Sequence, residues 1–271
     1  MKLRHIAEML GFRAPPRRYG YDVEDFDLGD EGTIRYAQWQ HPKNRPMRFE
    51  PAAIAELKRY IAPGDTVIDI GAHSGDTSVM FALAAGPKGR VFAVEPNSYV
   101  LPILEANASL NPRIAPIEIL PYAATAAPGK LVFRYSDAGF CNGGDLAAAD
   151  IGRHRHYYEL AVEGRNIADE LAARAPESLE RLRLIKSDTE GNDASVIASL
   201  RPLIDRHRPY LICEFYRHMD EASRRDFHRL LSGDLGYTVH LAGLWDGLAG
   251  EVLGPGDLMR EEHFDVFCVP A

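Results

Sequence analysis

Hydrophobic and polar positions alternate in blocks along most of the chain, and the blocks predict strands that alternate with helices. Short apolar runs rich in β-branched residues predict buried strands at 66–70, 90–94, 117–120, 131–135, 182–187 and 210–215. Apolar residues recur at helical spacing between them, which predicts helices over 51–61, 75–85, 98–110, 167–173, 194–200 and 221–231. Strands that alternate with helices indicate an α/β fold around a parallel, doubly wound sheet.

The two ends of the chain depart from this alternation. Strands expected at 237–241 and 263–269 would close the sheet as an antiparallel edge hairpin. Residues 33–39 alternate loosely and predict another strand near the N-terminus. We expect residues 1–50 to form an N-terminal extension or cap and residues 51–271 to form the main domain. A packed extension is favoured over a substrate-side lid, because nothing in this segment is chemically specific.

Composition argues against several classes of protein. The chain has 271 residues, 46% of them hydrophobic and 26% charged, as in ordinary globular proteins. The sequence contains no run of about 18 apolar residues, so it predicts no membrane span. The basic N-terminus lacks the apolar run of a signal peptide. A net charge of −8 argues against nucleic acid as the main partner. The three cysteines form an odd, sparse set that indicates free thiols in a reducing compartment, so we expect a cytoplasmic protein.

A glycine-bearing turn after the first central strand is the clearest candidate site. The segment reads Val67-Ile-Asp-Ile-Gly-Ala-His-Ser-Gly-Asp-Thr77. Gly71 allows a tight turn and the close approach of a ligand, and Gly75 allows close packing where the next helix starts. The N-terminus of that helix offers N–H groups that have no partner within the helix. Ligands in such sheets bind beyond the carboxyl ends of the strands.

Two carboxylates indicate which ligand this turn holds. A dinucleotide fingerprint would have a glycine where Asp69 stands, and a carboxylate there would repel a pyrophosphate. Asp69 better suits the ammonium and sulfonium groups of S-adenosylmethionine. Glu95 ends the next strand about 20 residues after Gly75, where a carboxylate can accept hydrogen bonds from both ribose hydroxyls. The pattern therefore favours S-adenosylmethionine over a nicotinamide cofactor.

Five segments resemble the FkbM-type S-adenosylmethionine-dependent methyltransferases. They are Phe49-Glu-Pro51, residues 63–76, Val94-Glu-Pro-Asn97, Ile185-Lys-Ser-Asp-Thr-Glu-Gly-Asn-Asp193 and Leu211-Ile-Cys-Glu-Phe-Tyr216. The resemblance covers roughly residues 49–216 and is most specific at 185–193. Within that segment, Ser187 replaces a usual aliphatic residue and Asp193 replaces a usual Glu.

The resemblance implies a class I methyltransferase fold with a Rossmann-like, mostly parallel sheet. It also implies methyl transfer from S-adenosylmethionine, commonly to a hydroxyl of a sugar, a glycan or a secondary metabolite. Residues at the ends of the first, second and fourth central strands are expected to bind the cofactor. They are Asp69, Gly71, Ala72, His73, Ser74, Gly75, Thr77, Glu95, Pro96, Asn97 and Asp188.

Side chains that end or follow the fourth and fifth central strands are the candidates for chemistry. Transfer to a hydroxyl requires an aligned acceptor and a group that removes its proton. We expect Asp188, Glu190, Glu214 and His218 to be catalytic, with Glu190 as the essential acid, and Tyr216 to contact the acceptor. Neighbouring carboxylates such as these raise one another's pKa toward a useful value.

Several alternatives stay open at this point. Asp188 could cap the helix that begins near Asn192, or could bind Mg²⁺ together with Glu214, because hard oxygen ligands suit that ion; a site without metal is favoured. Asn142 in the glycine-rich loop 139–144 is a further candidate contact to the acceptor. The acceptor could be an amine of an amino sugar, or the chain could be a non-catalytic methyltransferase-like binding module. We expect a small-molecule or glycan acceptor, and a homodimer is left open.

Overall fold

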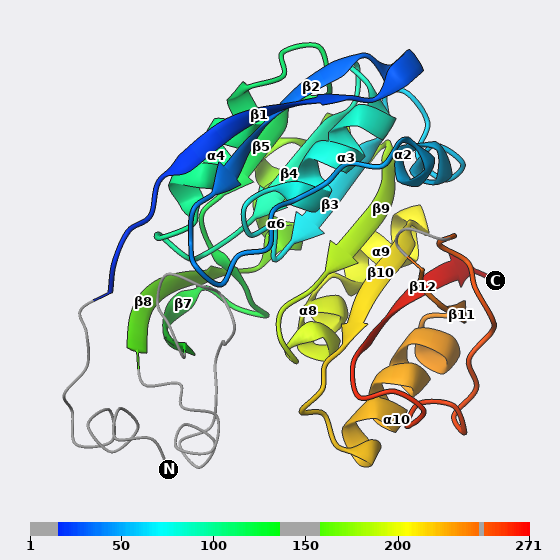
Figure 1. Cartoon of the computed structure of the whole chain (residues 1–271). Helices are drawn as coiled ribbons and strands as arrows, with labels where there is room; N and C mark the ends of the chain where they lie inside the picture. Colours follow the sequence, from blue (N-terminus) through cyan, green and yellow to red (C-terminus); the bar gives the residue numbers. More distant parts are fainter. Residues whose placement is uncertain (1–15, 136–157, 244–246) are drawn as a thin grey trace.

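The computed structural model describes residues 16–135, 158–243 and 247–271 (Figure 1). Its centre is a seven-stranded sheet in the order β11-β12-β10-β9-β3-β4-β5. These strands are β3 (Thr66–Ile70), β4 (Arg90–Val94), β5 (Ile117–Leu120), β9 (Leu182–Ser187), β10 (Tyr210–Phe215), β11 (Tyr237–Leu241) and β12 (Phe264–Pro270). The five strands from β5 to β10 run parallel, whereas β12 is antiparallel to both β10 and β11. The predicted α/β fold with an antiparallel C-terminal edge is therefore confirmed.

Helices cover both faces of this sheet. They are α2 (Pro51–Leu57), α3 (Asp76–Ala85), α4 (Leu101–Ser109), α6 (Ile167–Arg174), α7 (Pro176–Leu179), α8 (Asp193–Ser199), α9 (Arg201–His207) and α10 (Glu221–Arg229). The helix predicted over 51–61 ends at Leu57, where tighter turns continue through Tyr60. The sequence pattern did not predict α9, which follows α8 directly and has Pro202 in its first turn, a position that proline favours.

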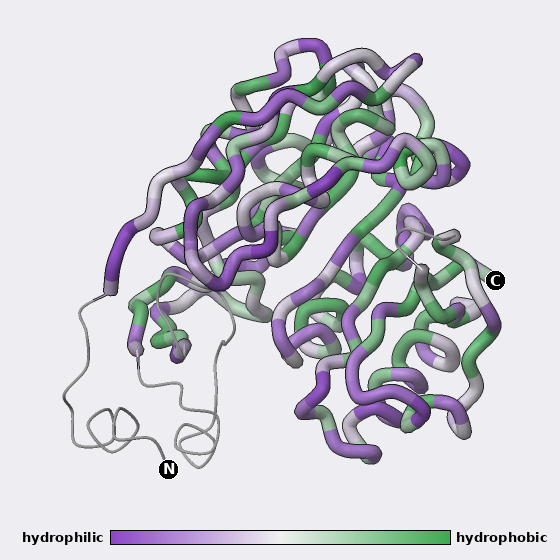
Figure 2. The backbone as a smooth tube through the Cα atoms, in the orientation of Figure 1, coloured by the Kyte–Doolittle hydropathy of each residue, from purple (hydrophilic) through white to green (hydrophobic). Residues whose placement is uncertain are grey.

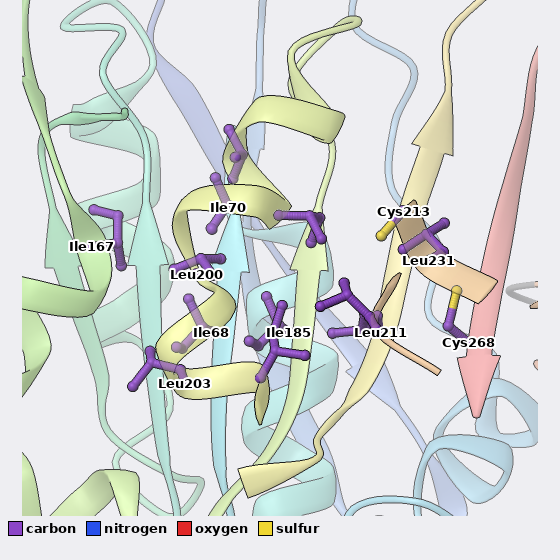
Figure 3. Packing of buried hydrophobic residues seen from close by; sticks show 14 of the residues in the cluster. Ile68, Ile70, Ile167, Ile185, Leu200, Leu203, Leu211, Cys213, Leu231 and Cys268 are labelled. Atoms are coloured by element: carbon purple, nitrogen blue, oxygen red, sulfur yellow. The ribbon is translucent and has the colours of Figure 1, made fainter. Parts of the chain in front are cut away.

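Side chains of the central strands alternate between two cores, one on each face of the sheet. Ile68 and Ile185 point into the core that α8, α9 and α10 complete (Figure 3). Val67 and Leu184 point to the opposite face, where they pack with α3. Figure 2 shows hydrophobic residues along the central strands and a largely hydrophilic α10. Among the described residues, none of the helices combines the length and apolar character that crossing a membrane requires.

An N-terminal hairpin packs on the second of these cores. It pairs β1 (Tyr21–Asp27) with β2 (Thr33–Trp39), and the structure adds β1 to the strand that the sequence predicted. Ile34 and Tyr36 of β2 belong to the same buried cluster as Val79 and Phe81 of α3. Because the hairpin and α2 shield it, α3 is apolar and buried on nearly all sides. The described part of residues 1–50 thus packs as an integral layer on the sheet domain.

A small second sheet stands at the carboxyl ends of the parallel strands. Its strands are β6 (Ala123–Ala124), β7 (Gly129–Tyr135) and β8 (Tyr158–Arg165), in the order β6-β8-β7. β6 begins just after β5 ends, so the sheet forms one side of the edge where ligands of parallel sheets bind.

Candidate functional site

The turn between β3 and α3 is held in a conformation that requires glycine. Gly71 and Gly75 have φ angles of 78° and 89°, and His73 between them has a φ of 48°. A Cβ on Gly71 would lie 1.9 Å from the backbone oxygen of Asp188, and one on Gly75 would lie 2.8 Å from Leu104 Cδ1. The Gly71 constraint therefore comes from the neighbouring β9 turn, in addition to the ligand approach that the sequence suggested.

Asp69 lies beneath this turn and is not among the residues that line the neighbouring cavity. Its carboxylate is fully buried, and its Oδ2 accepts hydrogen bonds from the hydroxyls of Thr77 at 2.8 Å and Ser78 at 2.5 Å. Its Oδ1 lies 3.6 Å from Lys186 Nζ. The direct contact between Asp69 and a cationic ligand stays a prediction; in the structure, Asp69 holds the start of α3 and pairs with a buried cation.

Lys186 is a site residue that the sequence analysis did not single out. It is 5% exposed near the end of β9, and its ammonium also lies 3.3 Å from Asp188 Oδ2. Burial disfavours the ammonium, but Asp188 and Asp69 outweigh that effect and hold the pKa of Lys186 above its ordinary value. The signal in the sequence was a lysine that directly follows the apolar pair Leu184-Ile185 in a predicted central strand.

Glu95 ends β4 with its carboxylate anchored by the backbone. Its Oε2 accepts from the N–H of His73 at 2.9 Å, and its Oε1 accepts from the N–H of Asn97 at 2.7 Å. Burial raises the pKa of Glu95 to about 7, and the two backbone N–H groups oppose that rise. Glu95 therefore joins the glycine turn to the end of the second central strand.

A cavity of about 500 Å³ brings these elements together, which is within the usual size range of small-molecule sites. Its wall combines the glycine turn, the ends of β4 and β9 and an apolar roof from the small sheet. It includes Gly71, His73, Asp76, Thr77, Glu95, Pro96, Tyr122, Thr125, Leu131, Phe133, Tyr135, Lys186, Asp188, Thr189, Glu190, Asn192 and Ser195. The sequence analysis identified the turn and the strand ends but assigned no role to the roof.

The predicted site residues divide between the cavity wall and the layer behind it. Of the predicted cofactor residues, Gly71, His73, Thr77, Glu95, Pro96 and Asp188 line the cavity, whereas Asp69, Ala72, Ser74, Gly75 and Asn97 are buried residues that do not line it. Of the predicted catalytic residues, Asp188 and Glu190 line it, whereas Glu214 and His218 do not. Tyr216 also lies off the wall, and Asn142 lies outside the described residues.

Glu190 is presented to the cavity by a strained turn that follows β9. Its φ is 56°, and its N–H donates to Glu214 Oε2 at 3.0 Å. Burial and the negative charge of Asp188 raise the pKa of Glu190 to about 7, and a hydrogen bond from Tyr216 opposes the rise. A half-buried carboxylate with such a pKa, on the wall of a cavity, has the properties of a general base.

Glu214 supports this turn from behind. Burial, followed by the charge of Asp188, raises the pKa of Glu214 to about 10, so the carboxyl is protonated at neutral pH. Its Oε1 lies 3.4 Å from His263 Nδ1. His218 is exposed, and its ring lies 5.0 Å from the Tyr216 ring between centroids. Glu214 is thus placed as a neutral partner for the backbone of Glu190, and His218 lies away from the cavity wall.

Among the described residues, no third acidic, histidine or cysteine side chain joins the suggested Mg²⁺ pair of Asp188 and Glu214. Asp188 lies on the cavity wall, whereas Glu214 uses one oxygen for the Glu190 N–H. Within the described residues, no three His, Cys, Asp or Glu side chains come together as a group that could hold a metal ion.

Comparison with known proteins identifies the family. The methyltransferase FkbM domain matches residues 69–239, and no curated protein matches the sequence. A crystal structure of methyltransferase FkbM from Methylobacillus flagellatus KT is 17% identical, with a TM-score of 0.45; the similarity covers 79% of this chain and 52% of that one. The chain thus spans about half the length of that protein.

Other solved structures have similarly low sequence identity and TM-scores. The O-methyltransferase from Bacillus cereus in complex with SAH is 14% identical, with a TM-score of 0.43 and coverage of 80% of this chain and 78% of that one. The SAM-dependent methyltransferase from Agrobacterium tumefaciens is 10% identical, with a TM-score of 0.48 and coverage of 95% and 71%. Nothing about the acceptor follows from such distant similarity.

The family match spans the glycine turn, Glu95, the β9 turn with Asp188 and Glu190, and the start of the antiparallel edge. The sheet that carries them is mostly parallel with an antiparallel edge, as the sequence predicted. The match also covers more than half of the chain, so the protein belongs to the FkbM methyltransferase domain family.

Proposed function

We propose that this protein transfers a methyl group from S-adenosylmethionine to a hydroxyl of a sugar, a glycan or a secondary metabolite. The observation that supports the proposal is one cavity whose wall holds both groups suited to a nucleoside and a group suited to act as a base. The glycine turn and Glu95 form the first, and Glu190 is the second. Cofactor and acceptor can therefore meet in a single cavity, as group transfer requires.

The chemistry of the cavity wall fits a cofactor of this kind. Glu95 is fixed by two backbone N–H groups and lies at the strand end where ribose hydroxyls are accepted. Asp76 and Asp188 add carboxylates to the wall, and the ammonium of Lys186 is paired with Asp69 and Asp188. Such a wall suits a ligand with ammonium and sulfonium groups better than a pyrophosphate. When bound, this cofactor supplies a methyl group that is already activated by a positive sulfur.

Glu190 is the residue proposed to take the proton of the acceptor hydroxyl. At a pKa of about 7, a large fraction of the carboxyl is ionised at neutral pH and still basic enough to bind a proton. The N–H of Glu190 donates a hydrogen bond to the Glu214 carboxyl, and the hydroxyl of Tyr216 donates one to the Glu190 carboxylate. These two bonds fix the position of the base. Phe133 of the roof is partly exposed on the cavity wall, where an aromatic side chain can pack against a sugar ring.

Calorimetric titration with S-adenosylhomocysteine, with NAD in parallel, tests the cofactor assignment. We expect micromolar binding of S-adenosylhomocysteine and none of NAD. Glu95→Ala should weaken that binding at least tenfold, because both ribose contacts are charge-assisted. Glu105→Ala is the matched control, since Glu105 is exposed on α4. A folded wild-type protein that binds NAD and not S-adenosylhomocysteine would overturn the proposal.

Turnover with hydroxyl and amine acceptors tests the reaction. We expect mass spectra to locate the new methyl group on oxygen, and Glu190→Gln to abolish turnover while S-adenosylhomocysteine binding stays within about twofold. Unchanged turnover in Glu190→Gln would remove the base assignment. A methyl group found on nitrogen would replace the hydroxyl acceptor with an amine, and binding without turnover by any acceptor class would favour a non-catalytic module.

A further inference from the structure

Two asparagines form hydrogen bonds with the backbone at the free edge of β2. Asn107 lies in α4, and Asn111 lies just beyond its end. Asn111 bonds both backbone groups of Arg35, accepting from its N–H and donating to its carbonyl at 2.8 Å each. Asn107 does the same for Ala37, at 2.6 Å and 3.2 Å. Four residues of helix rise about 6 Å and two residues of strand about 6.7 Å, so the two spacings match. The asparagines therefore take the place of a neighbouring strand and attach the N-terminal hairpin to the sheet domain.

Asn107 differs from Asn111 in one further bond. Its amide also donates to the backbone oxygen of Ser74 at 2.8 Å, and its side chain is fully buried. Ser74 lies in the middle of the glycine turn. Asn107 thus links β2 and the glycine turn through a single amide group, whereas Asn111 contacts β2 alone.

Residues of β2 contact the same turn directly. The hydroxyl of Tyr36 lies 3.0 Å from the hydroxyl of Ser74, and Tyr36 is 2% exposed. The ring of Trp39 packs edge-on against the ring of His73, with 5.3 Å between centroids. Ser74 and His73 are consecutive residues of a turn that contains three left-handed backbone conformations, at Gly71, His73 and Gly75. The turn is therefore held from outside by a layer that precedes it in the sequence.

We infer that Asn107 and Tyr36 are positioning residues for the glycine turn, and that the hairpin of residues 21–39 is a structural part of the cofactor site. A turn with several left-handed residues samples other conformations unless its surroundings restrict it. The hydrogen bonds to Ser74 restrict the conformation of the turn before a ligand binds, so less conformational entropy is lost on binding. The ligand named in the test rests on the proposed function, but the anchoring of the turn does not.

Matched variants of the two asparagines separate this role from simple stability. Asn107→Ala and Asn111→Ala each remove the two bonds to β2, and Asn107→Ala alone also releases Ser74. We expect Asn107→Ala to weaken S-adenosylhomocysteine binding about tenfold and to speed amide hydrogen exchange across residues 71–76. Asn111→Ala should lower the Tm yet leave both readouts at wild-type values.

Tyr36→Phe keeps the buried ring and removes only the hydroxyl that meets Ser74, so it tests the anchor even where Asn107→Ala folds poorly. We expect it to weaken binding about threefold and to speed exchange in the same segment. Wild-type affinity and exchange in both Asn107→Ala and Tyr36→Phe would overturn the inference. If the wild-type protein itself fails to bind S-adenosylhomocysteine, the proposed function fails, and the exchange comparison still decides the anchoring of the turn.

Discussion

Replacing Lys186 by methionine should destabilise the protein strongly, because it removes the cation of a buried ion pair. Lys186 is 5% exposed, and its ammonium lies 3.6 Å from the fully buried carboxylate of Asp69. Methionine keeps the unbranched apolar stem and fills nearly the same volume. The carboxylate of Asp69 would then be buried with two hydroxyl donors and no positive charge.

The distances give the expected size of the effect. At 3.6 Å and an effective dielectric constant of about 20, Coulomb's law gives about 4–5 kcal/mol for the Lys186–Asp69 pair. Asp188 is 43% exposed on its side chain, so its pairing with Lys186 is screened and contributes less than about 1 kcal/mol. Loss of one partner from a buried pair typically costs about 3–5 kcal/mol. We therefore expect Lys186→Met to lower the free energy of unfolding by about 4 kcal/mol.

Urea unfolding at pH 7 measures this loss, with Arg183→Met as the matched control on the same strand. The Arg183 side chain is 48% exposed, and its partner Asp65 also pairs with Arg181, so the control should lose less than about 1 kcal/mol. The double variant Asp69→Asn with Lys186→Met should recover most of the loss, because the amide oxygen can still accept from Thr77 and Ser78. Without this recovery, the loss would come from packing and not from charge.

The pH dependence gives an independent check. Burial already raises the pKa of Asp69, and loss of Lys186 should raise it further. A carboxyl whose pKa is higher in the folded than in the unfolded state binds its proton more tightly when folded. Its contribution to the free energy of unfolding therefore falls as pH rises above about 4. The deficit of Lys186→Met should therefore shrink as pH is lowered from 7 toward 4. A deficit below about 1 kcal/mol at pH 7, or one that does not change with pH, would refute the reasoning.

Three further predictions concern the cavity. The kcat/KM should rise with pH and level off above about 7, since Glu190 must be ionised to accept a proton. Asp188→Asn should shift this rise to lower pH, because it removes a like charge beside Glu190. A rise that Asp188→Asn does not shift would disprove that coupling. Gly71→Ala should lower the free energy of unfolding in urea by more than about 2 kcal/mol, because its Cβ would lie 1.9 Å from the backbone oxygen of Asp188. Gly129→Ala should lower it by less than about 1 kcal/mol, because a Cβ there has no atom within 4 Å. Equal losses in the two variants would contradict the close approach. Glu214→Gln should keep the stability at pH 7 within about 1 kcal/mol, since a carboxyl with a pKa of about 10 is already neutral; a larger loss would mean that Glu214 is ionised.

Much of the sheet and its glycine turn could be predicted because the signals are local. The bounds of β3, β4, β5, β9 and β10 agree with the predicted strands, since buried parallel strands are short apolar runs bounded by turn residues. Glycine at 71 and 75 marks left-handed backbone, and carboxylates that end parallel strands meet at one edge of the sheet. Position along the chain was therefore enough to bring Glu95, Asp188 and Glu190 to one cavity.

The remaining features depend on partners that are distant in the sequence. β1 is almost wholly exposed and strongly acidic, and its apolar alternation stops after Val23. Its pairing with β2 is what shows it to be a strand. Asn107 is an asparagine inside a helix, and nothing near it in the sequence indicates that it meets residues 37 and 74. The direction in which Asp69 points was also hidden, because a strand residue at a sheet's carboxyl end can face either a ligand or the helix that follows.

The buried pair of Asp69 and Lys186 changes how the cavity selects its ligand. The sequence argument had Asp69 repel a pyrophosphate directly, but its carboxylate is fully buried and its hydroxyl partners are Thr77 and Ser78. Lys186 is the lysine among the described residues of the cavity wall, and its ammonium lies between Asp69 and Asp188. On the proposed function, we expect Asp69 to influence the ligand through Lys186, because a paired lysine leaves the wall carboxylates Asp76 and Glu95 to favour a cation. Asp69 therefore both holds the start of α3, through Thr77 and Ser78, and balances the charge of Lys186 on the cavity wall.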